Sequence, residues 1–69
     1  MPVGSLVKMA NQIVANQRYL ARPAAVASVA GHLKSFWTPR MIDDLRAHLE
    51  QGGSDVDPIA AEAVRSIAS

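Results

Sequence analysis

The sequence contains no cysteine. Disulfide bonds, cysteine-ligated zinc, iron–sulfur clusters and a cysteine nucleophile are therefore excluded. Histidine is scarce as well, with only His32 and His48, whereas a zinc site needs three or four ligands at suitable spacing. We therefore expect this chain to hold no metal or redox cofactor of its own.

Long apolar runs are also absent. No stretch approaches the roughly 18 apolar residues that a membrane span requires. The first residues, MPVGSLVK, lack the basic start and the apolar stretch of a signal peptide. Together with the lack of cysteine, which fits a reducing compartment, these absences lead us to expect a cytoplasmic protein with no membrane association.

The chain is short and poor in aromatic residues, with one Phe, one Trp and one Tyr among 69 residues. Residues 1–69 are enough for a single domain, which at this size buries only about 60% of the surface of the unfolded chain. There is no phosphate-binding glycine loop and no nucleophile motif. We expect no catalysis by this chain alone, and we expect a protein partner to add to its marginal stability.

Acidic residues are missing from the first 42 positions. That part carries five cations: Lys8, Arg18, Arg22, Lys34 and Arg40. All six acids lie from Asp43 onward. This asymmetry has two interpretations, a basic face for an acidic protein or a nucleic acid, or an ordinary surface once folding mixes the two halves. We favour mixing, and the scattered cations argue against nucleic acid, because they form no basic run and have few aromatic neighbours.

Apolar residues recur at helical spacing in four segments, and no segment shows the strict alternation of a strand. We expect helices from Ser5 to about Leu20, from Pro23 to Phe36 or Trp37, from Pro39 to about Glu50 and from Pro58 to about Ile67. The predicted fold class is all-α, a small bundle of four short helices. The expected core consists of Leu6, Met9, Ile13, Val29, Leu33, Phe36, Leu45, Leu49 and Val64.

The sharpest boundary signal lies where the second expected helix meets the third. Proline disfavours helical dihedrals at the residue before it, so the second helix should end near Trp37. Thr38 is then a suitable N-cap and Pro39 a suitable first residue of the next helix. The pair Asp57-Pro58 repeats this signal, and Gly52-Gly53 marks the end of the helix before it.

Phe36 and Trp37 are neighbours on the second expected helix, where successive residues point 100° apart. They therefore flank its apolar stripe, and one can be deep in the core while the other reaches the edge. Trp and Arg are over-represented among interface hot spots, which makes Trp37 and Arg40 the first candidates for binding. The alternatives are that Trp37 completes the core and that Arg40 is a solvated residue at a helix start.

Folding alone explains three polar residues only in part. Asn11 and Gln12 are mid-helix amides, which helix propensity does not favour, and Arg40 in a first turn opposes the helix dipole. A partner that accepts hydrogen bonds would offset these costs, whereas the alternative is an ordinary solvated face. We predict a protein interface formed by Asn11, Gln12, His32, Trp37 and Arg40.

Two blocks, MANQI at residues 9–13 and HLKSFWTPRM at residues 32–41, carry a family resemblance. Their combination resembles the small delta subunit of the soluble, NAD-dependent, molybdenum-containing formate dehydrogenases of bacteria. A Leu-rich helix, a Gly-Gly turn and a final Pro-led helix follow in both, so the resemblance covers nearly the whole chain. Thr38 stands where the family usually has Asp, and Ile42 replaces a common basic residue, which makes the third helix less basic.

The resemblance implies a non-catalytic accessory subunit that supports assembly or stability of the large molybdenum-containing subunit. In such complexes the large subunit carries molybdopterin guanine dinucleotide and iron–sulfur clusters, while other subunits carry FMN and the NAD site. The implied partners are that large catalytic subunit and its partner subunits. Assembly factor and permanent subunit both remain open, as does the alternative of a stand-alone helical module that binds protein or nucleic acid.

Overall fold

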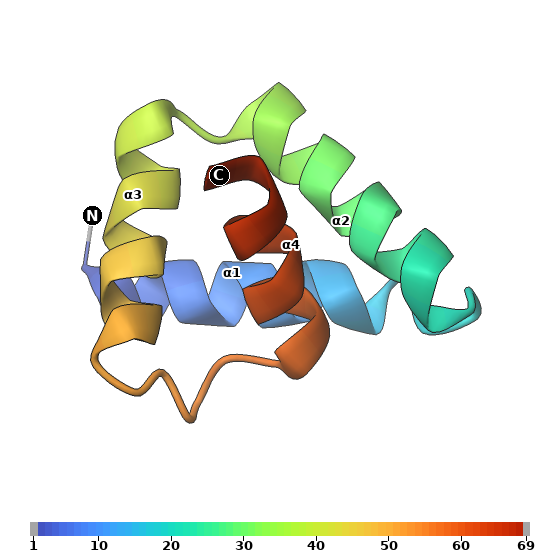
Figure 1. The fold of residues 1–69 in the computed structure, drawn as a ribbon, viewed down its shortest axis with the longest axis horizontal. Coiled ribbons are helices and arrows are strands. Elements are labelled where there is room, and N and C mark those ends of the chain that lie inside the picture. The colour runs from blue at the N-terminus through green and yellow to red at the C-terminus, as the bar shows by residue number, and fades with distance from the viewer. Residues whose placement is uncertain (1, 69) are drawn as a thin grey trace.

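The computed structural model describes residues 2–68, which form four helices and no strand (Figure 1). The helices are α1 (Val3–Ala15), α2 (Arg22–Phe36), α3 (Pro39–Glu50) and α4 (Pro58–Ala68). The predicted all-α fold of four short helices is confirmed. In this described part of the chain, no helix is long and apolar enough to cross a membrane.

Three of the helices form a triangle that the fourth covers from one side. α1 and α2 meet near the turn that joins them and diverge from there, while α3 lies across their open end (Figure 1). α4 lies in front of α1 in this view and packs chiefly against α2 and α3. The largest fully buried side chains lie where the helices meet: Leu6, Val14, Val29, Leu33, Leu45 and Val64.

The local signals for the starts of α3 and α4 are confirmed. The Thr38 hydroxyl accepts a hydrogen bond from the backbone N–H of Met41 at 3.3 Å. The Asp57 carboxylate accepts one from the backbone N–H of Ile59 at 2.9 Å. Each cap satisfies a backbone donor that has no partner inside the helix, so these two starts are fixed by residues at the junctions themselves.

The glycine pair after α3 also behaves as expected. Gly52 and Gly53 both have positive φ, 124° and 56°. A Cβ on Gly53 would lie 2.9 Å from the Cα of Leu49, so a larger residue would collide with the helix it follows. The turn therefore needs glycine both for its backbone conformation and for space.

The start of α1 differs from the prediction. The helix begins at Val3, and Ser5 lies inside it instead of capping it. The carbonyl of Pro2, whose own backbone is extended, accepts hydrogen bonds from the N–H groups of Ser5 and Leu6 at 3.0 and 3.4 Å. Pro2 thus occupies the N-cap position without a side-chain cap, whereas Ser5, where the helix was expected to start, is of a residue type typical of N-caps.

The end of α1 was also predicted wrongly, because the helix stops at Ala15 and not near Leu20. The N–H of Gln17 donates to the carbonyl of Val14 at 2.9 Å, which tightens the chain into a turn. The Gln17 side chain accepts a hydrogen bond from the hydroxyl of Ser28 on α2 at 3.0 Å. The turn is therefore held by a contact with α2, and no glycine or proline marks it in the sequence.

Three residues of the expected core are not fully buried, although Ile13 still packs against the core. Met9 and Phe36 are exposed by 37% and 73%, and Ile13 is only half-buried, whereas the other six are buried. Trp37, exposed by 7%, is buried next to the exposed Phe36. α2 ends at Phe36 and the backbone of Trp37 is extended, so the indole turns inward in a direction that helical spacing does not describe.

Candidate functional site

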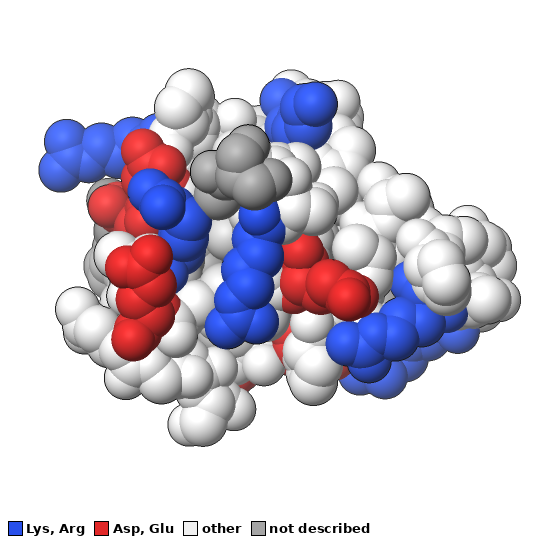
Figure 2. Space-filling view, viewed as in Figure 1, with Lys and Arg blue, Asp and Glu red and all other residues white. Residues whose placement is uncertain are grey.

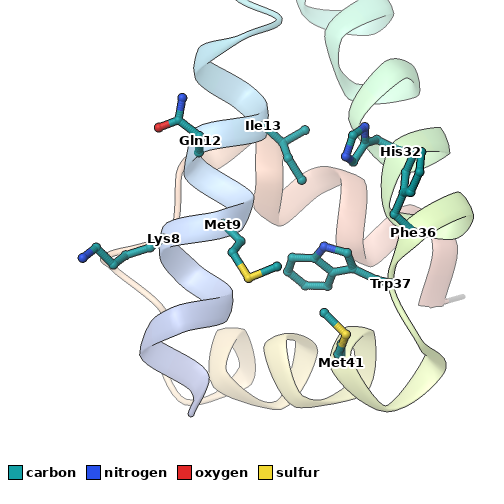
Figure 3. Close-up of a pocket in the computed structure, with 8 residues that line it drawn as sticks. All are labelled: Lys8, Met9, Gln12, Ile13, His32, Phe36, Trp37 and Met41. Carbon is teal, nitrogen blue, oxygen red and sulfur yellow. The ribbon is translucent and has the colours of Figure 1, made fainter. Parts of the chain in front are cut away.

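An open groove of about 590 Å³ lies between α1 and α2 and reaches α3, with α4 behind it (Figure 3). Its position follows from the triangle, since α1 and α2 diverge and α4 covers only the other side. The groove is lined by Lys8, Met9, Gln12, Ile13, His32, Phe36, Trp37 and Met41. Apolar side chains thus predominate, with polar groups at a few positions.

The wall on α2 consists of two exposed rings one helical turn apart. The ring centroids of His32 and Phe36 are 4.7 Å apart, and the rings are tilted by 39°. Residues four apart on a helix are neighbours on its surface, so the spacing alone brings the two rings together. On α1 the same geometry places Met9 and Ile13 on the opposite wall (Figure 3).

Trp37 lies at the centre of the groove and belongs to the core at the same time. Its nitrogen lies on the edge that faces Ile13 and His32 (Figure 3). A buried Trp usually finds an acceptor for its N–H, but no described residue accepts one here. Among the described residues, the enclosed side-chain polar atom without a partner is Arg46 Nε. The unpaired indole nitrogen of Trp37 is therefore not enclosed, and its N–H is open to the groove.

The charged residue at the groove is a cation. Lys8 lines the groove together with the neutral polar residues Gln12 and His32, and no acid lines it. Lys8 and Gln12 extend from α1 away from Trp37, so their polar ends lie at the outer edge of the α1 wall (Figure 3). With the indole N–H of Trp37, the polar groups offered here include several hydrogen-bond donors, a set suited to a partner that brings acceptors.

The structure brings together three of the five predicted interface residues, Gln12, His32 and Trp37. Arg40 is exposed and forms no hydrogen bond or ion pair with a described residue, although it directly precedes Met41 of the groove. Contact of these residues with a partner protein stays a prediction. The groove also includes Met9, Ile13 and Phe36, which the sequence analysis assigned to the core. A place at the margin of an apolar stripe was a signal for Phe36 alone.

Asn11 has a role within the chain that the sequence did not reveal. Its amide nitrogen donates to the carbonyl of Asp55 at 2.9 Å, and its amide oxygen accepts from the N–H of Asp57 at 2.8 Å. Both contacts fasten α1 to the loop that leads into α4. The predicted interface role of Asn11 stays a prediction, but its position in mid-helix now has a structural reason.

The two halves of the charge pattern pair with each other in the fold. Arg18 lies 3.3 Å from Asp57, and Arg22 lies 3.4 Å from Glu62. Figure 2 shows acidic and basic side chains interspersed over the face that α4 covers. Two of the five cations of the first half are therefore matched with acids, which weakens the case for a basic surface that binds nucleic acid.

No group of His, Cys, Asp or Glu in the described residues is placed to hold a metal ion. His48 and Asp55 form a pair, with Nε2 and Oδ1 2.8 Å apart, but no third ligand joins them. The hydrogen bond from His48 lowers the pKa of the Asp55 carboxyl below its ordinary value of 3.8. The side chains of the described residues thus form no cluster that fits a metal ion or an iron–sulfur cluster.

The described residues thus define a small four-helix protein with an open, mainly apolar groove on one side. Residues 5–64 match the family described as NADH-dependent formate dehydrogenase delta subunit FdsD, and the chain belongs to this family. The match includes every residue that lines the groove. No curated protein and no solved structure matches the chain.

Proposed function

We propose that this chain is a non-catalytic accessory subunit of an NAD-dependent formate dehydrogenase. In this role it supports the assembly or stability of the large molybdenum-containing subunit. The observation that carries the proposal is the family match over residues 5–64. The described residues add support, because they contain a groove for contact but no cluster that could hold a metal. The NADH dependence in the family's description supports a cytoplasmic location.

The proposed contact surface includes Gln12, His32 and Trp37 of the groove, together with Arg40 beside it. Asn11 contributes on the same helix, through the loop that it holds or by direct contact. Binding to one folded state and not to the unfolded chain stabilises that state by mass action. A chain of 69 residues and the subunit that it contacts would therefore stabilise each other.

The test is to produce the formate dehydrogenase complex with and without this chain in the same host. The measurements are the yield of assembled large subunit, its molybdenum content and its thermal inactivation rate. Without the chain, we expect less assembled subunit or faster inactivation. Equal values for all three would overturn the proposal.

Adding the purified chain afterwards separates the two forms of the role. If late addition restores stability and the chain stays bound at a fixed ratio, it acts as a permanent subunit. If only co-production restores yield or molybdenum content, it acts during assembly. An unrelated helical protein of similar size is the control for non-specific protection.

A further inference from the structure

The groove exposes apolar side chains that a small soluble fold usually covers. Phe36 is 73% exposed and Met9 is 37% exposed, on opposite walls of the same groove. Between them the indole N–H of Trp37 has no acceptor among the described residues. Exposed apolar patches bordered by polar residues mark interaction sites, so the groove is the surface where an occupant is expected.

The charges at the groove specify the chemistry of that occupant. Lys8 and His32 line it, while the acids of the chain begin at Asp43 and none of them reaches it. Gln12 and Trp37 add N–H groups that can donate. The complement to this arrangement is an apolar segment that also carries carboxylates.

The backbone specifies the shape of the occupant. The described residues form no strand, so they offer no sheet edge to which a partner strand could be added. Among the recurring modes of recognition, a helix that places its apolar face in a groove suits a groove lined by flexible apolar side chains between two helices. Met9 and Met41 are suited to this, because their flexible side chains adapt to the shape of an incoming side chain.

A second copy of this chain fits the groove poorly. In a two-fold dimer through this face, the same patch would meet itself. Lys8 of each copy would then face a surface with no carboxylate to pair with it, and like charges that are brought together oppose association. The charge pattern thus favours a different chain.

We propose that the groove binds an amphipathic helix of another formate dehydrogenase subunit. The apolar face of that helix contacts Phe36, Met9 and Trp37, and a carboxylate at its edge pairs with Lys8. This inference rests on the proposed function and adds to it the binding site on this chain and the kind of segment bound.

The experiment measures the dissociation constant between this chain and the formate dehydrogenase complex purified without it. Phe36→Ala and Lys8→Glu are the test variants. Tyr19→Ala is the matched aromatic control, because Tyr19 is 81% exposed and lies outside the groove. Arg65→Glu is the charge control on α4, and circular dichroism establishes that each variant retains its helices.

We expect both test variants to bind at least about tenfold more weakly, as for interface anchors, and both controls to stay within about twofold. Lys8→Arg, which keeps the charge, should bind like the wild type. If the wild type binds but Phe36→Ala and Lys8→Glu bind equally well, the groove is not the site, while the proposed function stands. If the controls lose as much as the test variants, the groove assignment is overturned as well. If the wild-type chain does not bind the purified complex, the groove proposal fails, while the co-production test decides the proposed function.

A photo-reactive phenylalanine analogue at position 36 identifies the occupant directly. The cross-linked peptide, read by mass spectrometry from the assembled complex, should come from another subunit. It should show apolar residues at helical spacing and at least one Asp or Glu. A cross-link to a second copy of this chain, or to a segment without acids, would overturn the proposed occupant.

Discussion

The side of α1 that meets the loop before α4 differs from the side that borders the groove. On the loop side, both ends of the Asn11 amide bond to backbone groups, at 2.9 and 2.8 Å. On the groove side, Gln12 and the indole N–H of Trp37 have no hydrogen-bond partner among the described residues, and Phe36 is exposed. The loop side is completed by the chain itself, whereas the groove side offers groups that another molecule can pair.

The charges follow the same division. Arg18 and Arg22 pair with acids near or on α4, while Lys8 at the groove pairs with no described residue. Arg18 and Arg22 are both well exposed, so each pair contributes about 0–1 kcal/mol to stability at most. At the groove, Lys8 is therefore a cation that another molecule can pair, beside the unpaired donors of Gln12 and Trp37.

Replacing Trp37 should have the largest effect, since this residue belongs to both the groove and the core. Trp37→Ala removes a side chain that is 7% exposed and should lower the free energy of unfolding by about 3 kcal/mol or more. Denaturation followed by circular dichroism measures the loss. Phe36→Ala is the comparison, because Phe36 is 73% exposed and its removal should cost about 0.5 kcal/mol or less. Equal losses would mean that Phe36 supports the fold and does not mark a free surface.

Asn11 and Gln12, two neighbouring amide side chains on α1, should give the next largest difference between the loop side and the groove side. Asn11→Ala leaves the N–H of Asp57 and the carbonyl of Asp55 without their partner, so we expect a loss of about 1–3 kcal/mol. Gln12→Ala should change stability by about 0.5 kcal/mol or less. Urea denaturation of both variants measures the difference. If the two costs are the same, the hydrogen bonds of Asn11 do not hold the loop.

A smaller effect is expected from pH, through the loop side alone. The hydrogen bond from His48 lowers the pKa of Asp55 in the folded chain below 3.8. A carboxyl whose pKa is lower when folded stabilises the fold above its unfolded pKa and loses that contribution as pH falls through the folded value. The stability advantage of the wild type over Asp55→Asn should therefore shrink below about pH 4. Denaturation between pH 7 and pH 3 measures it, and a constant difference would contradict the pairing.

Arg40→Ala should have the smallest effect on folding. Arg40 is exposed and pairs with no described residue, so the free energy of unfolding should change by about 0.5 kcal/mol or less. Binding to the complex should weaken by about 1–2 kcal/mol if Arg40 is an interface anchor. Arg65→Ala is the control cation, and a pull-down compares the three proteins. Wild-type binding by Arg40→Ala would place the interface elsewhere.

The sequence by itself determined the four helices and most of their ends. The signals at these ends act within a few residues, so they could be recognised from the local sequence. They are proline before or at a helix start, the Thr38 and Asp57 caps and the glycine pair after α3. The two blocks around residues 9–13 and 32–41 also led to the family that the match over residues 5–64 confirms. The end of α1 was missed, because a contact between Gln17 and Ser28 of another helix holds the turn there.

Only the tertiary structure decided which large side chains are covered and which are free. Helical spacing predicts the same position for Phe36 and Trp37, at the two margins of the apolar stripe. In the structure the helix ends at Phe36, and the extended backbone at Trp37 turns the indole inward. The groove exists because α1 and α2 diverge while α4 covers their other side, and the Asn11 contacts join residues more than 40 positions apart. Such features depend on how distant segments are placed in space, which the periodicity of any one segment does not contain.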